Sequence, residues 1–333
     1  MKYRAASFGF GVIGQMVAKT ILEQKKDWLE LVAAIDIDPS KVGMDIGEIL
    51  GTKKYGVKVT NSISQAIKEK PDIVIHTTSS YFEKTFPELR ELVENRVNVI
   101  SSCEELSYPY FNRKLARELD SIAKKNDVSV LGTGINPGFV MDVLPIVLTA
   151  PCIKIKRIRV ARQMNAATRR IPFQKKIGAG LSKKEFSLAI KHRAITGHVG
   201  LRQSISMLAD SLSWKLDKIV IEEPRPVVLA REVQSKWKKI YPGTVAGTSQ
   251  AAFGLANGRK VIDYRFKAYI GAKSEFDLVD IDGTPKVHFK SNPCINGDSG
   301  TIAMLINMIP KVINGKSGLL TMRDLTLPSS VSA

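Results

Sequence analysis

The chain has 333 residues, of which 44% are hydrophobic and 25% are charged. This composition is typical of a globular protein long enough for two domains or one large one. The longest apolar stretches, such as residues 140–150, are interrupted by Asp142 and Pro145 and are too short to cross a bilayer. We therefore expect no membrane-spanning segment.

The charge and the cysteines argue against a nucleic-acid-binding protein and against a metal site. Lysines and arginines give a net charge of +18 but are spread along the chain without a basic-aromatic module, so we expect no nucleic-acid binding. A lysine-rich surface that attracts anionic cofactors explains this charge better. Cys103, Cys152 and Cys294 are odd in number and lack metal-ligand spacing. They predict reduced thiols in a cytoplasmic enzyme, with no metal site.

A glycine-rich turn follows the first predicted strand. Residues 3–10 are β-rich and enter Gly9-Phe10-Gly11-Val12-Ile13-Gly14, and residues 15–24 continue as an amphipathic helix. In this G-x-G-x-x-G pattern the first glycine permits the bend, the second lets a pyrophosphate approach, and the third lets the helix pack on the strand. The strand-turn-helix context favours a dinucleotide site over a turn without a ligand. The predicted cofactor-binding residues here are Gly9, Gly11, Val12, Ile13 and Gly14.

The next predicted strand supplies a carboxylate. It ends at Asp36, about 20 residues beyond the last glycine, where a ribose-binding acid is expected. Asp36 is followed by Ile37 and Asp38, and this acidic surrounding favours NAD because a 2′-phosphate would meet like charge. Lys41 is close enough in sequence that use of NADP stays open.

Three further strands are predicted to end in polar or glycine-rich residues. They comprise residues 71–76, 97–102 and 128–131. Ligands of open α/β sheets bind at the carboxyl ends of the strands. We therefore expect this edge to border the cofactor through Thr77, Thr78, Ser79, Ser102, Cys103 and Asn136, with the Asn136 amide bonded to a carboxamide. His76 ends an apolar strand and is interpreted as a packed or hydrogen-bonded core residue.

The order of the predicted elements gives the fold class, α/β. Strands alternate with helices through residues 1–140, which predicts an N-terminal Rossmann domain with a doubly wound parallel sheet. Residues 141–298 predict a second, α+β domain with a mainly antiparallel sheet, for substrate binding and dimerisation. Residues 299–333 predict a C-terminal helix and tail that return to the first domain.

With these residues in view, the chain resembles 2,4-diaminopentanoate dehydrogenases and the related native amine dehydrogenases, within the dihydrodipicolinate-reductase-like superfamily. The Cys-Glu-Glu-Leu segment at 103–106 and the Arg-Arg and Gln-Lys-Lys segment at 169–176 are its most specific motifs. True dihydrodipicolinate reductases carry adjacent histidines, which this chain lacks. The resemblance extends over the whole length and rests on residues 9–14, 101–109, 134–139, 169–180, 197–201 and 319–325.

The resemblance implies an NAD(P)-dependent enzyme that reversibly deaminates a small amine or diamino acid to a ketone and ammonia. It implies that Glu104 handles protons beside the nicotinamide. Glu105 should point elsewhere if the backbone is extended, so we interpret it as structural or as a support of Glu104, and whether it shares the proton chemistry stays open. Asn165 stands where we expect an aspartate in many diaminopentanoate enzymes, which favours a simpler amine or an amino acid with a distal amine. The implied substrate-pocket residues are Phe139, Met164, Asn165, Arg169 and His198.

Some alternatives stay open. His198 is nearly as well explained as a structural histidine, and Arg169 as an ion-pair partner. The enzyme is alternatively 2,4-diaminopentanoate dehydrogenase proper, or another imine or carbonyl reductase of the superfamily. A non-catalytic NAD-binding regulator is the alternative from a different class. The expected partners are a small amine or ketone and ammonia, and the family habit implies a homodimer.

Overall fold

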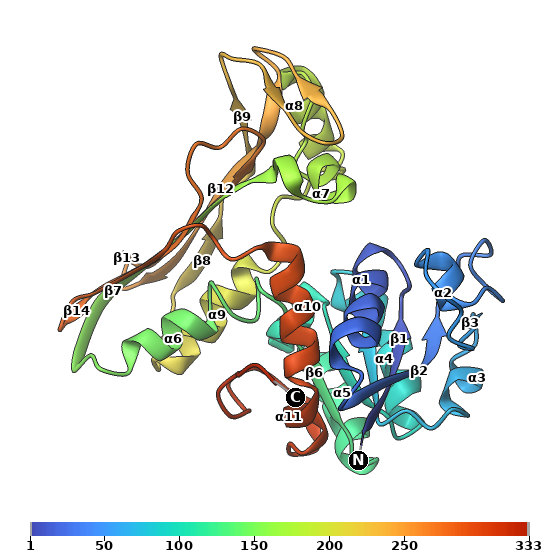
Figure 1. Ribbon diagram of the computed structural model, residues 1–333. Coiled ribbons are helices and arrows are strands. Elements are labelled where there is room, and N and C mark those ends of the chain that lie inside the picture. The colour runs from blue at the N-terminus through green and yellow to red at the C-terminus, as the bar shows by residue number, and fades with distance from the viewer. Residues whose placement is uncertain (1, 332–333) are drawn as a thin grey trace. The chain divides into compact units, whose positions relative to one another are not determined.

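The chain divides into two compact units in the computed structural model, which describes residues 2–331. The first unit contains the residues up to Phe139 together with those from Gly297 onward, and the second contains Val140–Asn296. Figure 1 shows the helices and strands of each unit. Between residues 2 and 331, no helix has the length and apolar character that a membrane crossing requires.

The first unit is built on a seven-stranded parallel sheet. The strand order is β16-β6-β5-β4-β1-β2-β3, so the chain starts near the centre, builds one half of the sheet and then crosses to the other half. This is the doubly wound order of a dinucleotide-binding fold, with its reversal between β1 and β4. The predicted Rossmann sheet is thus confirmed. The strands are β1 Tyr3–Phe8, β2 Leu29–Ile35, β3 Val59–Thr60, β4 Ile73–His76, β5 Asn98–Ser101, β6 Ser129–Gly132 and β16 Gly318–Leu320.

Helices cover this sheet, and their starts follow capping chemistry. Ser62 accepts a hydrogen bond from the backbone N–H of Gln65 (3.2 Å), as its position before an apolar run predicts. Asn112 caps the next long helix through the N–H of Leu115 (3.3 Å). The helices are α1 Val12–Thr20, continued by a π-helical turn at Ile21–Lys25, α2 Ile46–Ile49, α3 Ile63–Ile67, α4 Phe82–Glu94, α5 Arg113–Lys125, α10 Gly297–Asn307 and α11 Ile309–Ile313.

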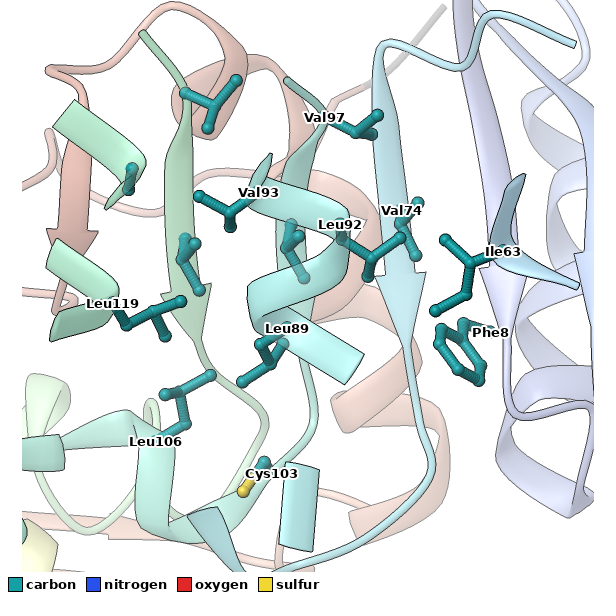
Figure 2. Close-up of a cluster of buried hydrophobic side chains, with 14 of the residues drawn as sticks. Phe8, Ile63, Val74, Leu89, Leu92, Val93, Val97, Cys103, Leu106 and Leu119 are labelled. Carbon is teal, nitrogen blue, oxygen red and sulfur yellow. The ribbon is translucent and has the colours of Figure 1, made fainter. Parts of the chain in front are cut away.

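One apolar layer joins α4 and α5 to the sheet. Leu89 and Leu92 of α4 and Leu119 of α5 are fully buried with Val74 of β4, as Figure 2 shows. Burying one such leucine contributes about 1.5–3 kcal/mol. Elsewhere in this unit, α10 packs against α1, and α11 packs against β5 and β6. This packing holds the parallel strands in register, so that their carboxyl ends share one edge.

The second unit contains a mainly antiparallel sheet. Its order is β15-β14-β7-β13-β12-β8, with β9 also paired to β12. Only β7 and β13 among these neighbours run parallel. The predicted α+β character is confirmed. The strands are β7 Lys154–Asn165, β8 Lys218–Ile221, β9 Arg225–Val228, β12 Val245–Ala256, β13 Arg259–Tyr269, β14 Phe276–Thr284 and β15 Val287–Ser291, with a separate pair of β10 Val233–Gln234 and β11 Lys239–Ile240.

Apolar and basic residues alternate along β7, and this alternation determines which face of the sheet is buried. Ile158 and Val160 are buried, whereas Arg159 between them is exposed, which is the period-two pattern of a half-buried strand. Helix α9 packs against β8, β12 and β13, and also against α6. The helices of this unit are α6 Val143–Thr149, α7 Ile171–Lys176, α8 Lys183–Lys191 and α9 Leu201–Ser211.

Candidate active site

The glycine loop between β1 and α1 is tightly packed at two positions and open at a third. A Cβ added to Gly14 would lie 2.1 Å from the Gly9 carbonyl oxygen, and one added to Gly9 would lie 2.8 Å from the Thr77 carbonyl oxygen. Gly9 also has a φ of +88°. At Gly11, the N-cap of α1, an added Cβ would meet no protein atom within 4 Å. The open glycine at a helix start fits the approach of a pyrophosphate.

The two residues between these glycines start the helix. Val12 and Ile13 belong to the first turn of α1, whose N–H groups have no acceptor within a helix. Gln15 donates from its side chain to the Phe10 carbonyl oxygen (3.0 Å) and so fixes the loop. The loop therefore presents backbone donors at the point where Gly11 leaves space.

The end of β4 supports the glycine loop. Thr77 donates through Oγ1 to the Gly9 carbonyl oxygen (2.7 Å) and through its N–H to the Phe8 carbonyl oxygen (2.7 Å). Ser79 accepts from the N–H of Tyr81 (3.4 Å) through its hydroxyl. These bonds fix the segment after β4 beside the loop after β1, where the sequence places cofactor-binding residues.

His76, the last residue of β4, is fully buried and hydrogen-bonded. Its Nδ1 lies 2.9 Å from Ser101 Oγ, and its Nε2 lies 2.8 Å from Glu88 Oε2. Thr78 donates to the same Glu88 oxygen (2.7 Å). Burial raises the pKa of Glu88, but the hydrogen bonds from His76 and Thr78 lower it by more, so the pKa falls below its ordinary value. This confirms the interpretation of His76 as a core histidine, and it assigns Thr78 to the same network.

Asp36 follows β2 and is held by two contacts. Its Oδ1 accepts from the N–H of Asp38 (2.8 Å), and its Oδ2 lies 3.2 Å from Lys41 Nζ. The residue is buried to 8% exposure. A carboxylate at this sheet edge fits hydrogen bonding to a ribose. The ion pair with Lys41 was not part of the sequence prediction.

After β5, the backbone of Ser102 and Cys103 follows the sheet edge, whereas the Cys103 side chain is directed into the core. Ser102 donates its N–H to the His76 carbonyl oxygen (3.0 Å), so it lies beside the end of β4. The Cys103 side chain is buried in the core near Leu89 and Leu106 (Figure 2), and burial raises the pKa of its thiol to about 12. The predicted contact of Cys103 with a cofactor is therefore restricted to its backbone, because its side chain is directed into the core.

Glu104 and Glu105 begin the 3-10 turn at Glu104–Ser107 and have different surroundings. The Glu105 carboxylate accepts from the N–H of Phe82 (2.8 Å) at the start of α4. It therefore satisfies a helix terminus, which agrees with the structural role predicted for it. The Glu104 side chain is half-buried, and its carbonyl oxygen accepts from the Ser107 hydroxyl (2.8 Å). Glu104 thus lies at the carboxyl edge, immediately after the buried Cys103.

The turn after β6 completes this edge. Gly138 has a φ of +123°, and an added Cβ would lie 2.4 Å from the Gly134 nitrogen. Ile135 donates its N–H to Thr301 Oγ1 of α10 (3.4 Å). Asn136 lies in this turn with a buried side-chain oxygen, and the half-buried Phe139 ends the first unit. The predicted residues of this unit all follow parallel strands whose carboxyl ends share one edge.

The substrate-pocket residues predicted beyond Phe139 belong to the second unit. Asn165 ends β7, and its side-chain oxygen accepts from the N–H groups of Ala167 (3.1 Å) and Gly271 (3.1 Å). Its own N–H donates to Glu275 Oε1 (2.7 Å). The Asn165 amide therefore fastens the segment after β13 to the end of β7.

Met164, Arg169 and His198 lie around an apolar cluster that includes Phe173 and Phe266. The Arg169 guanidinium lies 3.2 Å from Met164 Sδ and 4.2 Å from the centre of the Phe173 ring. The His198 ring stacks on Phe266 with centres 4.6 Å apart. Met164 and Phe266 belong to the same buried cluster. The structure therefore groups these predicted residues within the second unit.

His198 is neutral in this environment. Burial lowers the pKa of His198 to about 3, and the positive charges of Lys176 and Arg162 contribute in the same direction. The backbone N–H of His198 donates to Gln250 Oε1 (2.8 Å), while the ring Nε2 is buried without a hydrogen-bond partner among residues 2–331. A neutral imidazole has one donor nitrogen and one acceptor nitrogen but carries no charge.

A buried ion pair lies next to the apolar cluster around Phe266, and it was not predicted from the sequence. Arg162 of β7 lies 3.0 Å from Asp277 of β14, and both side chains are 1% exposed. Asp277 also accepts from the N–H of Ile295 (2.8 Å), and Arg162 donates to the Ile295 carbonyl oxygen. Arg162 has the same alternation as Ile158 and Val160, which was the available signal for its burial.

Histidine, cysteine and carboxylate side chains do not gather in groups of three that could hold a metal ion anywhere between residues 2 and 331. The residues at the sheet edge instead fit a dinucleotide, as the open Gly11, the helix start and Asp36 indicate.

Comparison with known proteins covers both units. The family model described as "2,4-diaminopentanoate dehydrogenase C-terminal domain" matches residues 139–333. A second family model, "Dihydrodipicolinate reductase, N-terminus", matches residues 4–103. The 2,4-diaminopentanoate dehydrogenase of Acetoanaerobium sticklandii is 34% identical over 99% of this chain and 95% of its own length.

Two more distant proteins are also similar to this chain over nearly its whole length. An amine dehydrogenase of Streptomyces virginiae is 20% identical over 97% of this chain and 96% of its own length. The solved structure of an amine dehydrogenase from Mycobacterium smegmatis superposes with a TM-score of 0.87 at 22% identity, and covers 99% of this chain and 98% of that one. The last similarity shows the fold.

Proposed function

Because the chain belongs to the 2,4-diaminopentanoate dehydrogenase family and is therefore an oxidoreductase, we propose that it catalyses reversible oxidative deamination of a small amine. A primary ammonium, NAD(P)⁺ and water give a ketone, an ammonium ion, NAD(P)H and a proton. Family membership confirms the resemblance found in the sequence. The observation that carries the proposal is the position of Glu104. It is half-buried at the carboxyl edge of the sheet, and the glycine loop lies at the same edge.

The residues of the first unit suit a nicotinamide dinucleotide. Such a cofactor, when bound, accepts or supplies the hydride of the reaction. The first turn of α1 would hold its pyrophosphate beside Gly11, and Asp36 would accept hydrogen bonds from its ribose. Asn136 is the proposed partner of its carboxamide. NAD is the proposed cofactor, with NADP also accepted.

Glu104 is the proposed proton-handling residue. Its carboxylate would take a proton from the substrate ammonium, because the amine must be neutral before its carbon can lose a hydride. Once this proton has passed to solvent, the carboxylate is negative again, so it would stabilise the iminium that develops and accept a proton from the attacking water. Glu105 is engaged at the start of α4, so the two neighbouring carboxylates have separate roles in this proposal.

The proposed pocket residues favour an amine without a second ammonium close to the reacting carbon. Asn165 is neutral, and its side-chain oxygen already accepts two backbone hydrogen bonds. His198 is neutral because burial lowers its pKa to about 3. Arg169 and Met164 add no negative charge, so these residues of the second unit offer no anion for a second ammonium. A simpler amine, or an amino acid with a distal amine, suits them better.

We also propose that the enzyme works as a cytoplasmic homodimer. The three cysteines are free thiols, which suits a reducing compartment, and Cys103 is the one that is buried. Light scattering on the purified chain tests the dimer: a mass of twice 36.7 kDa is expected, and a monomer would contradict it. Fractionation of the source cells tests the location.

A test with ammonia separates the proposed function from its alternatives. The purified chain is mixed with NADH or NADPH and a panel of small ketones, with and without an ammonium salt. Cofactor oxidation that requires ammonium, together with formation of the amine, supports an amine dehydrogenase. Oxidation without ammonium indicates a carbonyl reductase or, with preformed cyclic imines, an imine reductase. Tight NADH binding without turnover on any substrate indicates a non-catalytic regulator.

A further inference from the structure

Lys41 bridges the two carboxylates that follow β2. Its Nζ lies 3.2 Å from Asp36 Oδ2 and 3.2 Å from Asp38 Oδ2. The Lys41 side chain is 21% exposed and that of Asp36 is 11% exposed, whereas that of Asp38 is 41% exposed. The ammonium is thus held against the proposed ribose-binding carboxylate while it keeps access to solvent.

The turn around Lys41 fixes this arrangement. Asp38 Oδ1 accepts from both the N–H (3.0 Å) and the hydroxyl (2.7 Å) of Ser40, and the Asp38 carbonyl oxygen accepts from the N–H of Lys41 (2.9 Å). Asp36 donates its own N–H to the Thr60 carbonyl oxygen (3.0 Å). These bonds hold the backbone of residues 36–41 in one closed turn, and the contacts with the Asp36 and Asp38 carboxylates hold the Lys41 ammonium.

The charges at this turn differ from those of a lone ribose-binding acid. Two carboxylates and one ammonium sum to a single negative charge, as one aspartate does, but the ammonium adds a local positive centre. Burial lowers the pKa of Lys41, but the hydrogen bonds and charges of Asp38 and Asp36 raise it by more, so the side chain stays protonated. A lone aspartate repels a 2′-phosphate, whereas an ammonium beside it attracts the same group.

We propose that Lys41 determines how far this site accepts the 2′-phosphate of NADP in addition to the ribose hydroxyls of NAD. The inference rests on the proposed dinucleotide site but not on any amine substrate. With a 2′-hydroxyl, Asp36 accepts the ribose hydrogen bond while Lys41 holds its second oxygen. With a 2′-phosphate, Lys41 and the phosphate form an ion pair, and Asp36 loses its bond to the ribose. NADH therefore binds more tightly, and NADPH binding depends on Lys41.

Binding measurements on the full chain test this role without substrate. Titration calorimetry gives the Kd of NADH, NADPH and 2′,5′-ADP for the wild type and for Lys41→Met. We expect the Kd values of NADPH and 2′,5′-ADP to rise about tenfold or more, because a charge-assisted bond to phosphate is lost. The Kd of NADH should change by less than about threefold.

Two variants serve as controls. Lys54→Met removes another lysine of the same segment, one that pairs with Glu48 (2.9 Å), and it should leave the three Kd values unchanged. Lys41→Arg keeps the charge and should retain NADPH binding, which also covers the case in which Lys41→Met does not fold. Asp38→Asn removes the competing carboxylate and should tighten NADPH binding.

The possible results separate this inference from the proposed function. Equal weakening of NADH and NADPH in Lys41→Met would make Lys41 a support of the turn and overturn the inference. Unchanged NADPH binding in that variant, or a wild type that binds NADH but not NADPH, would overturn it as well. If the wild type binds neither dinucleotide, the proposed function and the inference both fail.

Discussion

The carboxyl edge of the parallel sheet and the end of β7 arrange their polar residues in different ways. At the sheet edge, the residues follow β1, β2, β4, β5 and β6, and most of their fixed contacts involve backbone atoms. Around the end of β7, buried side chains contact one another as well as backbone groups, with Arg162 and Asp277 at 1% exposure and His198 stacked on Phe266. The first arrangement follows from topology, whereas the second depends on packing between residues distant in sequence.

This difference predicts where substitution harms stability and where it harms ligand binding. At the sheet edge, Gly11 borders open space, so a change there should leave the fold intact. Residues around β7 are buried charges and rings whose partners cannot be replaced by water. Variants in each region test this difference.

The largest effect on stability is expected from the buried ion pair. Arg162→Met leaves Asp277 without its buried cation, which costs about 3–5 kcal/mol of unfolding free energy. Urea unfolding followed by circular dichroism measures this loss. The double variant Arg162→Met with Asp277→Leu should recover much of it, because both charges are then absent. A single variant as stable as the wild type would show that the β7 region does not depend on this pair.

The glycine loop offers a matched pair of substitutions. Gly14→Ala places a Cβ 2.1 Å from the Gly9 carbonyl oxygen, which should cost at least the roughly 1–3 kcal/mol of ordinary overpacking. Gly11→Ala meets no protein atom within 4 Å and has a φ of −77°, so the fold should keep its stability. NADH binding to Gly11→Ala should nevertheless weaken, because the methyl group occupies the space assigned to the pyrophosphate.

Thermal unfolding and NADH titration of both glycine variants check this prediction. Equal losses of stability in Gly11→Ala and Gly14→Ala would contradict the contrast between open and packed positions. A stable Gly11→Ala variant that binds NADH as the wild type does would remove the pyrophosphate from this loop.

His198 predicts a pH dependence of stability. Its pKa falls from 6.5 to about 3 in the folded chain, so between these values the unfolded state binds a proton that the folded state does not. Stability therefore decreases as the pH falls through this window, by at most about 1.4 kcal/mol per pH unit. His198→Asn should reduce this slope in urea unfolding at several pH values. His192→Asn, at the exposed end of α8, is the matched control and should keep the wild-type slope.

The smallest effect concerns the thiols. Burial raises the pKa of Cys103 to about 12, and its side chain is 1% exposed, so alkylation of the native chain at pH 8 should leave Cys103 unmodified. Mass spectrometry of tryptic peptides after iodoacetamide treatment reads this directly, with denatured chain as the positive control. Rapid modification of native Cys103 would place its side chain at the sheet edge instead of in the core.

The same contrast explains how much could be predicted from the sequence. The parallel sheet, its glycine loop and Asp36 were predictable because turn glycines and strand ends have local sequence signals. The core position of His76 was predictable from the apolar strand that it ends. The segment 245–256, which forms β12, was not predicted, because its four alanines and two glycines have little strand preference. Pairing with β13, β8 and β9 makes it a strand.

Long-range contacts account for the rest of the site. The partner of Arg162 lies more than a hundred residues further along the chain, and no local pattern identifies Asp277. The two bonds that Asn165 accepts include one from Gly271, on a distant turn. Lys41 was recognisable as a nearby cation, but its position between Asp36 and Asp38 depends on the closed turn after β2.

The central claim is that Glu104 performs the proton chemistry while its neighbour Glu105 is structural. Its most direct test compares Glu104→Gln with Glu105→Gln in NADH titration and in reductive amination of a ketone that the wild type accepts. We expect both variants to bind NADH as the wild type does, and kcat to fall about 10²–10⁴-fold in Glu104→Gln alone. Near-normal turnover of Glu104→Gln, or an equal loss in Glu105→Gln, would contradict it.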